Sequence, residues 1–277
     1  MRLSELGPNA TALYRVAFAL PFLLLWLALE RRPAASNGAA RRRKISRSDW
    51  LVLALSGVFW SGDLVFWHWS ISLTNVANST FFACSSPIFV ILGAWLLFGE
   101  RISRGFLAGF ALTLAGGACL LGSSLAFGGG DFLGDIFGIV TAFFFGSYIL
   151  TIKHLRAGLP TGAIMFWSGL FSLPGLLLTA LLTGEGFVSE SLFGWSMIIG
   201  LALLAHTVGQ GLAAYALAHL PASFASVAFL GEPVVAAILG WIILAEALGP
   251  LQGAGCIIIL AGVWLAQRYG MRRQSGA

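Results

Sequence analysis

Residues 77–119, ANSTFFACSSPIFVILGAWLLFGERISRGFLAGFALTLAGGAC, recur as residues 223–265, SFASVAFLGEPVVAAILGWIILAEALGPLQGAGCIIILAGVWL. Aligned without a gap, the two segments share residues that are scarce in this chain: Pro87 and Pro233, Trp95 and Trp241, Glu100 and Glu246. We interpret the pair as a duplication. Long repeats made of apolar segments are typical of secondary transporters, in which two copies of one unit face each other across a central site.

The composition of the chain is that of a membrane protein. Hydrophobic residues make up 58% and charged residues 10%, with a mean hydropathy of +0.89, whereas soluble domains carry about 25% charged residues. A helix needs about 20 apolar residues to cross a bilayer. Nine stretches of that kind occur, at 11–30, 50–72, 77–98, 105–122, 134–152, 162–183, 192–217, 222–245 and 249–267. Because lipid offers the backbone no hydrogen-bond partners, we expect an all-α polytopic membrane protein.

The positions of the two copies predict an inverted repeat. The equivalent helices at 77–98 and 222–245 are five crossings apart, so they should run in opposite directions through the membrane. We expect a helical bundle with a first repeat at 1–123, a glycine-rich linker at 124–133 and a second repeat at 134–268. The second half has five helices and the first has four. A symmetric plan of five plus five therefore places one further helix before residue 1.

Basic residues predict the orientation. If residues 31–47 are cytoplasmic, 14 of the 16 lysines and arginines fall on that side, as the positive-inside rule requires, while Asp131, Glu185 and Glu190 fall opposite. The excess positive charge is thus accounted for by topology and attraction to anionic lipid, and a nucleic-acid partner is not expected. The expected location is a bacterial inner membrane.

The repeat also resembles a known family. The stretch VANSTFFACSSPIFVILGAWLLFGERISRGFLAGFALTLAGG and its later copy PASFASVAFLGEPVVAAILGWIILAEALGPLQGAGCIIILAGV are similar to the EamA repeat of the drug/metabolite transporter superfamily. That resemblance implies ten helices, both termini in the cytoplasm, and transport of amino acids and other metabolites. Among characterised members, the general character is similar to exporters of aromatic and neutral amino acids of the YddG type. The chain departs from the pattern in lacking the first helix and in having Ala245 where the first copy has Gly99.

One helix carries a polar, aromatic stripe. Asp63 shares a helical face with Trp60 and Trp67, three or four residues away, and His68 lies about a quarter turn from them. Ionisable residues inside a span are costly and are functional candidates by default. We expect Trp60, Asp63, Trp67 and His68 to bind substrate, with an ammonium held by the carboxylate and the indole faces. The alternative is that Asp63 joins a local polar pair while the tryptophans pack or anchor at an interface.

Further candidates lie in the second half. His206 and Gln210, one turn apart in 192–217, are expected to line the same cavity, although a satisfied structural histidine is an equal alternative. Glu232 directly precedes Pro233, and the equivalent pair in the first copy is Ser86 and Pro87. Both prolines should break their helices. Because the kink repeats and the charge does not, we assign coupling or gating to Glu232, Pro87 and Pro233, the alternative being a buried partner for a polar neighbour.

Other conspicuous residues are expected to serve the architecture. Glu100 and Glu246 lie beside helix ends, where they can bond backbone amides of the next helix or neighbouring basic groups. Arg15 lies near the outer end of its span and is expected to reach the interface. Glycine pairs with small-xxx-small spacing are expected at helix contacts or in a homodimer, namely Gly105/Gly109, Gly134/Gly138 and Gly249/Gly253.

The sequence thus favours a secondary transporter that moves a small metabolite, foremost a neutral or aromatic amino acid, by alternating access, with export favoured. A carrier of another metabolite or drug-like cation, or a membrane scaffold or receptor, remains the alternative. No ATP-binding loop or catalytic motif occurs in the sequence, so an enzyme is not expected, and no cofactor or metal is expected either. The expected partners are a small-molecule substrate, the lipid bilayer and, as an open alternative, a second copy of the chain.

Overall fold

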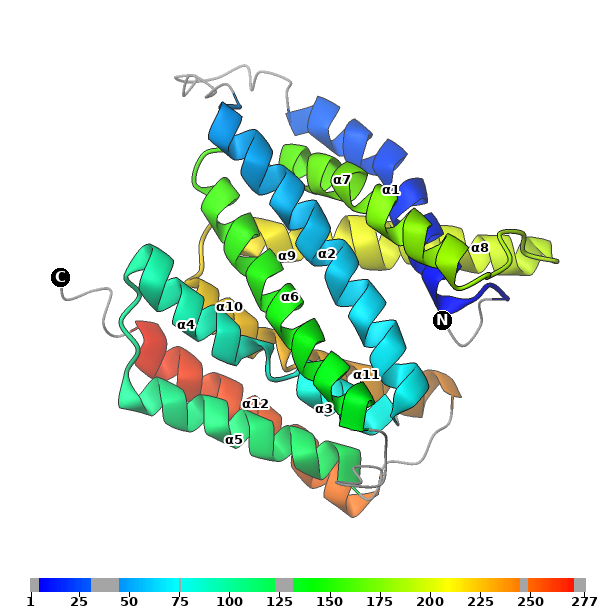
Figure 1. Ribbon diagram of the computed structural model, residues 1–277. Helices are drawn as coiled ribbons and strands as arrows, with labels where there is room; N and C mark the ends of the chain where they lie inside the picture. The colour runs from blue at the N-terminus through cyan, green and yellow to red at the C-terminus, as the bar shows by residue number, and fades with distance from the viewer. Residues whose placement is uncertain (1–4, 31–44, 75, 123–131, 245–248, 272–277) are drawn as a thin grey trace. The chain divides into compact units, whose positions relative to one another are not determined.

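The computed structural model describes residues 5–30, 45–74, 76–122, 132–244 and 249–271, and within these ranges it is helical with no strand (Figure 1). Among these described residues, nine helical stretches are long and apolar enough to cross a membrane: Pro8–Glu30, Arg47–Leu73, Asn78–Phe98, Arg104–Leu121, Phe132–Arg156, Thr161–Leu182, Leu192–Ala216, Ala222–Leu239 and Pro250–Tyr269. The predicted all-α membrane fold is therefore confirmed, with helix ends within a few residues of those expected.

The chain forms two compact units, each built from both halves of the sequence. The first unit contains residues 1–68 and 147–219, and the second contains residues 69–146 and 220–277. The boundary passes through two helices, α2 (Arg47–Leu73) and α6 (Phe132–Arg156). Repeat boundaries at 1–123 and 134–268 describe the duplication in the sequence rather than these units, and they stay a prediction.

The first unit holds α1 (Pro8–Glu30), the larger part of α2, the end of α6, α7 (Thr161–Leu182), α8 (Leu192–Gly200), η2 (Leu201–Gln210) and α9 (Gly211–Ala216). Helix α1 packs on α7 and also contacts η2 and α8. The contact with α7 is close because Gly162 lies against the backbone of Leu27, where a Cβ would come within 2.8 Å of the Leu27 nitrogen. The backbone N–H of Gly162 donates to Glu30 Oε2 at 2.8 Å, which ties the start of α7 to the end of α1.

The second unit holds the end of α2, α3 (Val76–Ala83), α4 (Ser86–Phe98), α5 (Arg104–Leu121), the start of α6, α10 (Ala222–Phe229), α11 (Glu232–Leu244) and α12 (Pro250–Met271). Helices α5 and α12 lie side by side. Gly109 faces Gly262, and Gly116 faces Gly255, so closely that a Cβ on Gly109 or Gly116 would meet a facing backbone oxygen at 2.7 or 3.0 Å. Such glycine contacts allow two backbones to approach.

The α5–α12 contact has two-fold character. In the duplication, Gly109 is equivalent to Gly255 and Gly116 is equivalent to Gly262. Each glycine therefore packs against the equivalent of the other, which is the reciprocal pattern of an isologous, two-fold interface. An antiparallel contact of this kind is what an inverted repeat requires of two equivalent helices.

Both predicted proline breaks are present in the second unit. Helix α3 stops at Ala83 and α4 starts at Ser86, while α10 stops at Phe229 and α11 starts at Glu232. The turns carry equivalent hydrogen bonds, from Ser85 N to Phe82 O and from Gly231 N to Ala228 O, both 2.9 Å. Each proline is the second residue of the following helix, where the missing N–H costs no helical bond. The duplicated sequence thus folds into a duplicated break.

Carboxylates at helix ends join the two halves of the sequence within each unit. Glu100 accepts hydrogen bonds from the backbone N–H of Ala222 and Ser223 at the start of α10, and not from the next helix, α5, which the sequence had favoured. In the first unit, Glu185 accepts a hydrogen bond from the backbone N–H of Ala10 in α1. Glu5 accepts hydrogen bonds from the Ser189 hydroxyl and the Ser191 backbone N–H, just before α8. The hydrogen bonds to Glu5 hold its pKa below the usual value, and the one from Ser189 contributes most. Glu246, the repeat equivalent of Glu100, lies outside the described residues.

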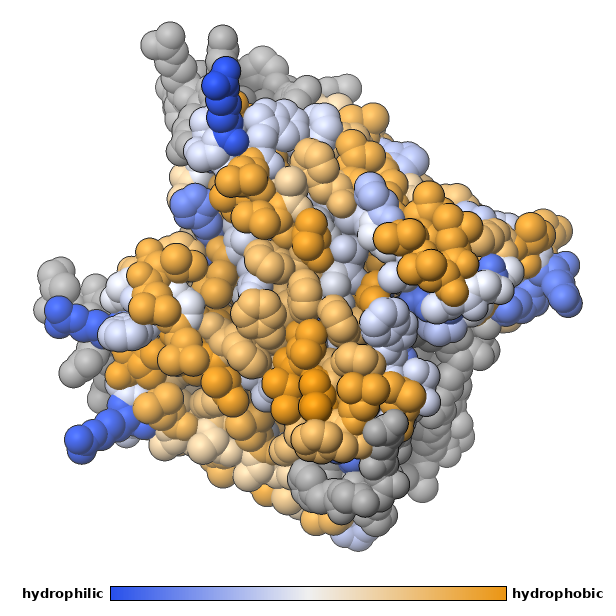
Figure 2. All heavy atoms as spheres, viewed as in Figure 1, coloured by the Kyte–Doolittle hydropathy of each residue, from blue (hydrophilic) through white to orange (hydrophobic). Residues whose placement is uncertain are grey.

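The outer surface of the helices is apolar. Large side chains such as Leu96 and Leu97 on α4 and Leu182 on α7 are about 70% exposed. Figure 2 shows hydrophobic residues over much of the viewed face. Such surfaces would be a liability in water and are expected of helices that contact lipid tails.

Candidate functional site

A buried cluster of polar and aromatic side chains lies inside the first unit. Its centre is Trp60 on α2, which is 3% exposed. The Trp60 ring lies 4.8 Å from the ring of Tyr148 on α6 and 5.6 Å from the ring of His206 on η2, measured between centroids. The guanidinium carbon of Arg15 on α1 lies 5.4 Å from the Trp60 ring centroid. Four separate helices therefore contribute side chains to one place.

His206 lies on an unusual stretch of helix. Residues Leu201–Gln210 form a π-helix between α8 and α9, and the Thr207 hydroxyl donates to Ala202 O, five residues earlier, at 2.9 Å. π-Helical turns are rare and are frequently found at functional sites. His206 is 2% exposed, and neither ring nitrogen has a hydrogen-bond partner among the described residues.

Trp60 shares this feature with His206. Its indole Nε1 is buried and has no hydrogen-bond partner in the part of the chain that the structure describes. A buried polar atom without a partner costs about 1–3 kcal/mol, and native proteins carry few of them. Two such side chains in ring contact are therefore a candidate for a site whose partner is a ligand.

Charged groups surround these rings. Asp63 is half-buried and lies one turn from Trp60 on α2. The guanidinium of Arg15 lies over the Trp60 ring, and the Tyr148 hydroxyl is 3.8 Å from Met165 Sδ. The cluster thus contains one carboxylate and one guanidinium within reach of buried aromatic groups.

His68 belongs to a neighbouring polar group at the other end of this part of α2. Its Nδ1 lies 3.3 Å from Asn9 Oδ1 on α1, and Asn9 Nδ2 donates to Glu185 Oε1 at 2.7 Å. The half-buried Trp67 stacks on His68 with ring centroids 5.5 Å apart. The predicted stripe therefore divides: Trp60 faces Arg15, Tyr148 and His206, whereas Trp67 contacts His68.

The structure thus brings Trp60 and His206 into ring contact and places Asp63 one turn from Trp60, while His68 contacts Asn9. Gln210 is the half-buried last residue of η2. Sequence reasoning missed Tyr148, and it placed Arg15 at the interface, whereas the structure stacks its side chain on Trp60. An arginine inside an apolar span was the signal that could have identified it, because such residues almost always face the protein interior.

The predicted gating residues lie in the second unit. Pro87 is buried and Pro233 is half-buried, at the two equivalent helix breaks. Glu232 is exposed, although it lies within the apolar span Ala222–Leu239. A charged carboxylate at this depth is expensive in lipid and is expected to face a water-filled space.

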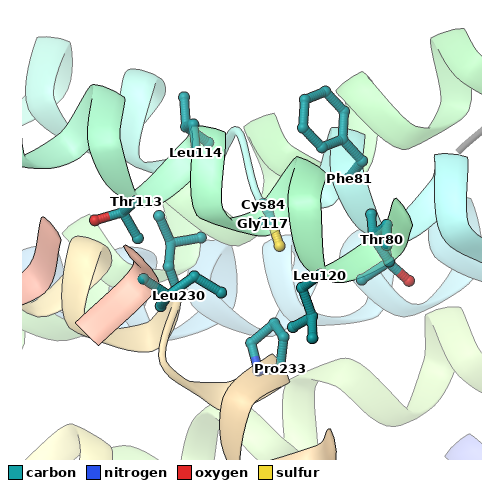
Figure 3. Close-up of a pocket in the computed structure, with 11 residues that line it drawn as sticks. Thr80, Phe81, Cys84, Thr113, Leu114, Gly117, Leu120, Leu230 and Pro233 are labelled. Carbon is teal, nitrogen blue, oxygen red and sulfur yellow. The ribbon is translucent and has the colours of Figure 1, made fainter. Parts of the chain in front are cut away.

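An apolar pocket adjoins these breaks (Figure 3). Its cavity volume is about 20 Å³, and it is lined mainly by apolar side chains of α3, α5, α11 and α12 with the two turns, including Phe81, Leu114, Leu120 and Leu230. The sulfur of Cys84 and the ring of Pro233 point into it. This lining has little to offer a charged group, so the pocket fits an apolar moiety.

Among the described residues, no three histidine, cysteine or acidic side chains are grouped so that they could hold a metal ion. The three cysteines, Cys84, Cys119 and Cys256, are free thiols.

The EamA-like transporter family matches residues 1–122 and 132–267, which is nearly the whole chain. The chain belongs to this family. Membership makes it a multi-pass membrane transporter rather than an enzyme, and it confirms the resemblance drawn from the duplicated segments.

Several curated relatives of this EamA-like transporter carry names of exporters. A "Probable terminal-alkyne amino-acid exporter" of Streptantibioticus cattleyicolor is 26% identical over 250 residues, covering 87% of this chain and 82% of that protein. A "Probable amino-acid metabolite efflux pump" of Salmonella typhimurium is 30% identical over 183 residues, covering 63% of this chain and 61% of that protein. A "Pseudopaline exporter CntI" of Pseudomonas aeruginosa is 25% identical over 216 residues, or 78% and 74% of the two chains.

A solved crystal structure shares the fold of the EamA-like transporter. The two superpose with a TM-score of 0.77 over 97% of this chain and 90% of the other, at 20% sequence identity. At that identity the similarity supports the helical architecture alone.

Proposed function

We propose that this EamA-like transporter is a secondary carrier of small metabolites, foremost neutral or aromatic amino acids, across a bacterial inner membrane. Export is the favoured direction, and alternating access is the proposed mechanism. Two relatives with amino acids in their names support an amino acid as the substrate, and a third relative named as an exporter of another compound supports the direction of transport. The bacterial sources of all three support the location.

The observation that carries the substrate class is the buried cluster around Trp60. Large aromatic rings give apolar contact area, while Arg15 and Asp63 supply charges of both signs inside an apolar bundle. Small-molecule sites are typically apolar with a few well-placed polar groups. A zwitterion with an apolar or aromatic side chain matches that combination better than a purely apolar compound or a simple cation does.

Alternating access fits the sequence duplication and the paired breaks. Inverted repeats allow one repeat to rock against the other around a fixed site. The equivalent breaks at Pro87 and Pro233 are positions where a helix can bend without losing a hydrogen bond of its interior. Glu232, beside one break, is the group that we assign to coupling or gating.

Counterflow into proteoliposomes tests the proposal. The purified protein is reconstituted in vesicles preloaded with one unlabelled amino acid, and uptake of the labelled form is measured for phenylalanine, leucine, threonine and lysine, with and without a pH gradient. We expect phenylalanine and leucine to exchange faster than lysine. The variant Trp60→Ala tests the role of the cluster. It removes the central ring and should lower phenylalanine exchange about 2- to 30-fold, as expected for loss of one aromatic contact. No exchange of any amino acid by the unmodified protein would contradict the proposal.

A further inference from the structure

Several buried nitrogen atoms of the first unit have no hydrogen-bond partner among the described residues, and three of them lie together on two side chains in ring contact. These three are Nε1 of Trp60 and both ring nitrogens of His206. The two side chains are 3% and 2% exposed, and their ring centroids are 5.6 Å apart. Leaving such atoms unpaired is costly, so their grouping at one point indicates a place where a ligand supplies the missing partner.

The hydrogen-bonding chemistry of these groups predicts the charge of the ligand. An indole N–H can only donate a hydrogen bond, a neutral imidazole donates through one of its two nitrogens, and a guanidinium only donates. Arg15, whose guanidinium lies over the Trp60 ring, therefore adds further donors and a positive charge to the same place. Such a set is suited to an acceptor that carries negative charge.

The same geometry argues against a substrate ammonium on the face of the Trp60 indole ring. The sequence predicted that Trp60 would hold a substrate ammonium by a cation–π contact. In the structure the guanidinium of Arg15 already lies 5.4 Å from the centroid of that ring, and Tyr148 lies 4.8 Å from it. A second cation there would be repelled by the first.

We infer that Arg15, Trp60 and His206 bind the carboxylate of a zwitterionic amino acid, with its ammonium turned toward Asp63. This inference rests on the proposed function and names the substrate group that each part of the site recognises. Asp63 is half-buried one turn along α2 from Trp60, and the Arg15 guanidinium lies over the Trp60 ring, so charges of both signs lie within about one helical turn of that ring. Because Trp60 and His206 are almost fully buried, the substrate enters when these side chains move apart.

The test compares substrates that differ in one charged group. Counterflow of labelled phenylalanine is measured against three unlabelled competitors: phenylalanine, phenylalaninamide, which lacks the carboxylate, and 3-phenylpropionate, which lacks the ammonium. We expect phenylalaninamide to compete about 10- to 100-fold more weakly than phenylalanine, the effect of losing hydrogen bonds to a charged group. 3-Phenylpropionate, which keeps the carboxylate, should lose affinity through the missing contact with Asp63 and regain it relative to phenylalanine in Asp63→Asn.

Two variants test the donors independently. Trp60→Phe keeps a ring and removes the N–H, and Arg15→Gln removes the charge. Both variants should weaken competition by phenylalanine, whereas the already weak competition by phenylalaninamide should stay unchanged. The ratio between the two competitors should therefore become smaller. Arg156→Gln is the matched control, because Arg156 also lies over an aromatic ring of the same unit, 6.0 Å from the centroid of Tyr215, and its Nη1 bonds the backbone of Leu159. That variant should retain the preference.

Each outcome has a separate meaning. Equal competition by phenylalanine and its amide in the unmodified protein would overturn the carboxylate assignment and leave the proposed function standing. An unchanged preference in Trp60→Phe and Arg15→Gln would also overturn it. Absence of exchange for every amino acid in the unmodified protein would overturn the proposed function, and this inference with it.

Discussion

Glu232 is an exposed carboxylate within an otherwise apolar span, and this position predicts that water reaches its side chain. A charge that faced the lipid would cost several kcal/mol, so the side chain should face water. We expect that Glu232→Cys, in a chain whose three native cysteines are replaced by alanine, reacts with a charged, membrane-impermeant thiol reagent. The measurement is the rate of labelling in vesicles.

The control for this prediction is Ile242→Cys on the same helix, where the native side chain is 66% exposed. If that surface faces lipid, the thiol there should stay protonated and unreactive, since the thiolate is the nucleophile and apolar surroundings disfavour it. Labelling of Glu232→Cys should be at least about tenfold faster, the effect of a single pKa unit on the thiolate fraction. Equal rates at both positions would contradict the idea of a water-filled space at Glu232.

At the scale of residues, the sequence selects candidates by the free-energy cost of placing them inside a membrane span. Trp60, Asp63 and His206 were selected because polar or large groups inside a span need a reason, and the structure brings Trp60 and His206 into ring contact. What could not be predicted was the partner of each face. Helical periodicity orders the residues of α2 among themselves, whereas the positions of Arg15 and Tyr148 depend on how α1 and α6 pack against α2.

At the scale of elements, two adjacent glycines in α5 allow the effect of helix packing on stability to be measured separately from the effect of helix propensity. A Cβ on Gly116 would lie 2.7 Å from the backbone nitrogen of Ile259 on α12, whereas a Cβ on Gly117 would meet nothing within 4 Å. We expect Gly116→Ala to lower the melting temperature in detergent, because α12 must move away. Gly117→Ala should raise it or leave it unchanged, because alanine is favoured over glycine in a helix by about 0.5–1 kcal/mol.

The pair is a matched control, since both changes add one methyl group to neighbouring positions of the same helix. Equal destabilisation by the two variants would show that the α5–α12 contact is not as close as the backbone geometry requires. Gly262→Ala tests the facing side, where a Cβ would lie 2.7 Å from Gly109 O, and it should behave as Gly116→Ala does.

The same contact shows what element-level patterns can and cannot predict. The sequence favoured small-xxx-small pairs, and Gly105 and Gly109 are both at the contact, against Tyr269 and Gly262, whereas Gly253 faces open space and Gly249 approaches only Gln252. The close approaches recur every seven residues, at Gly109 and Gly116 and at Gly255 and Gly262. A four-residue motif does not determine the crossing of two long helices, whereas the internal repeat would have identified these four glycines as equivalent pairs.

At the scale of the whole molecule, hydropathy was sufficient for the spans and the duplication was sufficient for their inversion. Hydropathy and the duplication are both properties to which many residues of a span contribute, so a misleading residue at one position changes neither prediction. The division into two compact units was not predictable, because each unit combines segments of both repeats. That division depends on contacts such as those of Glu30 with Gly162 and Glu100 with Ala222, which connect residues more than 120 positions apart.

The orientation of the chain gives a prediction for the whole molecule. The turn before α7, at residues 157–160, follows Lys153 and Arg156, and the turn at residues 99–103 contains Arg101, whereas residues 183–191 contain Glu185 and Glu190. Positive charge is retained on the cytoplasmic side. Reporter fusions ending at Arg101 and at Gly158 should therefore report cytoplasm, and a fusion ending at Gly186 should report the outer side. A fluorescent protein and a periplasmic phosphatase, used as a pair at each site, make the measurement.

These three sites test the helix count as well as the charge rule. Helices α5 and α6 separate Arg101 from Gly158, so an even number of crossings must return the chain to the same side, whereas α7 alone separates Gly158 from Gly186. Arg101 and Gly158 on opposite sides would mean that one of these helices does not span the membrane. All three sites reversed together would keep the spans and reject the orientation, because the charge bias and the helix count are independent physical constraints.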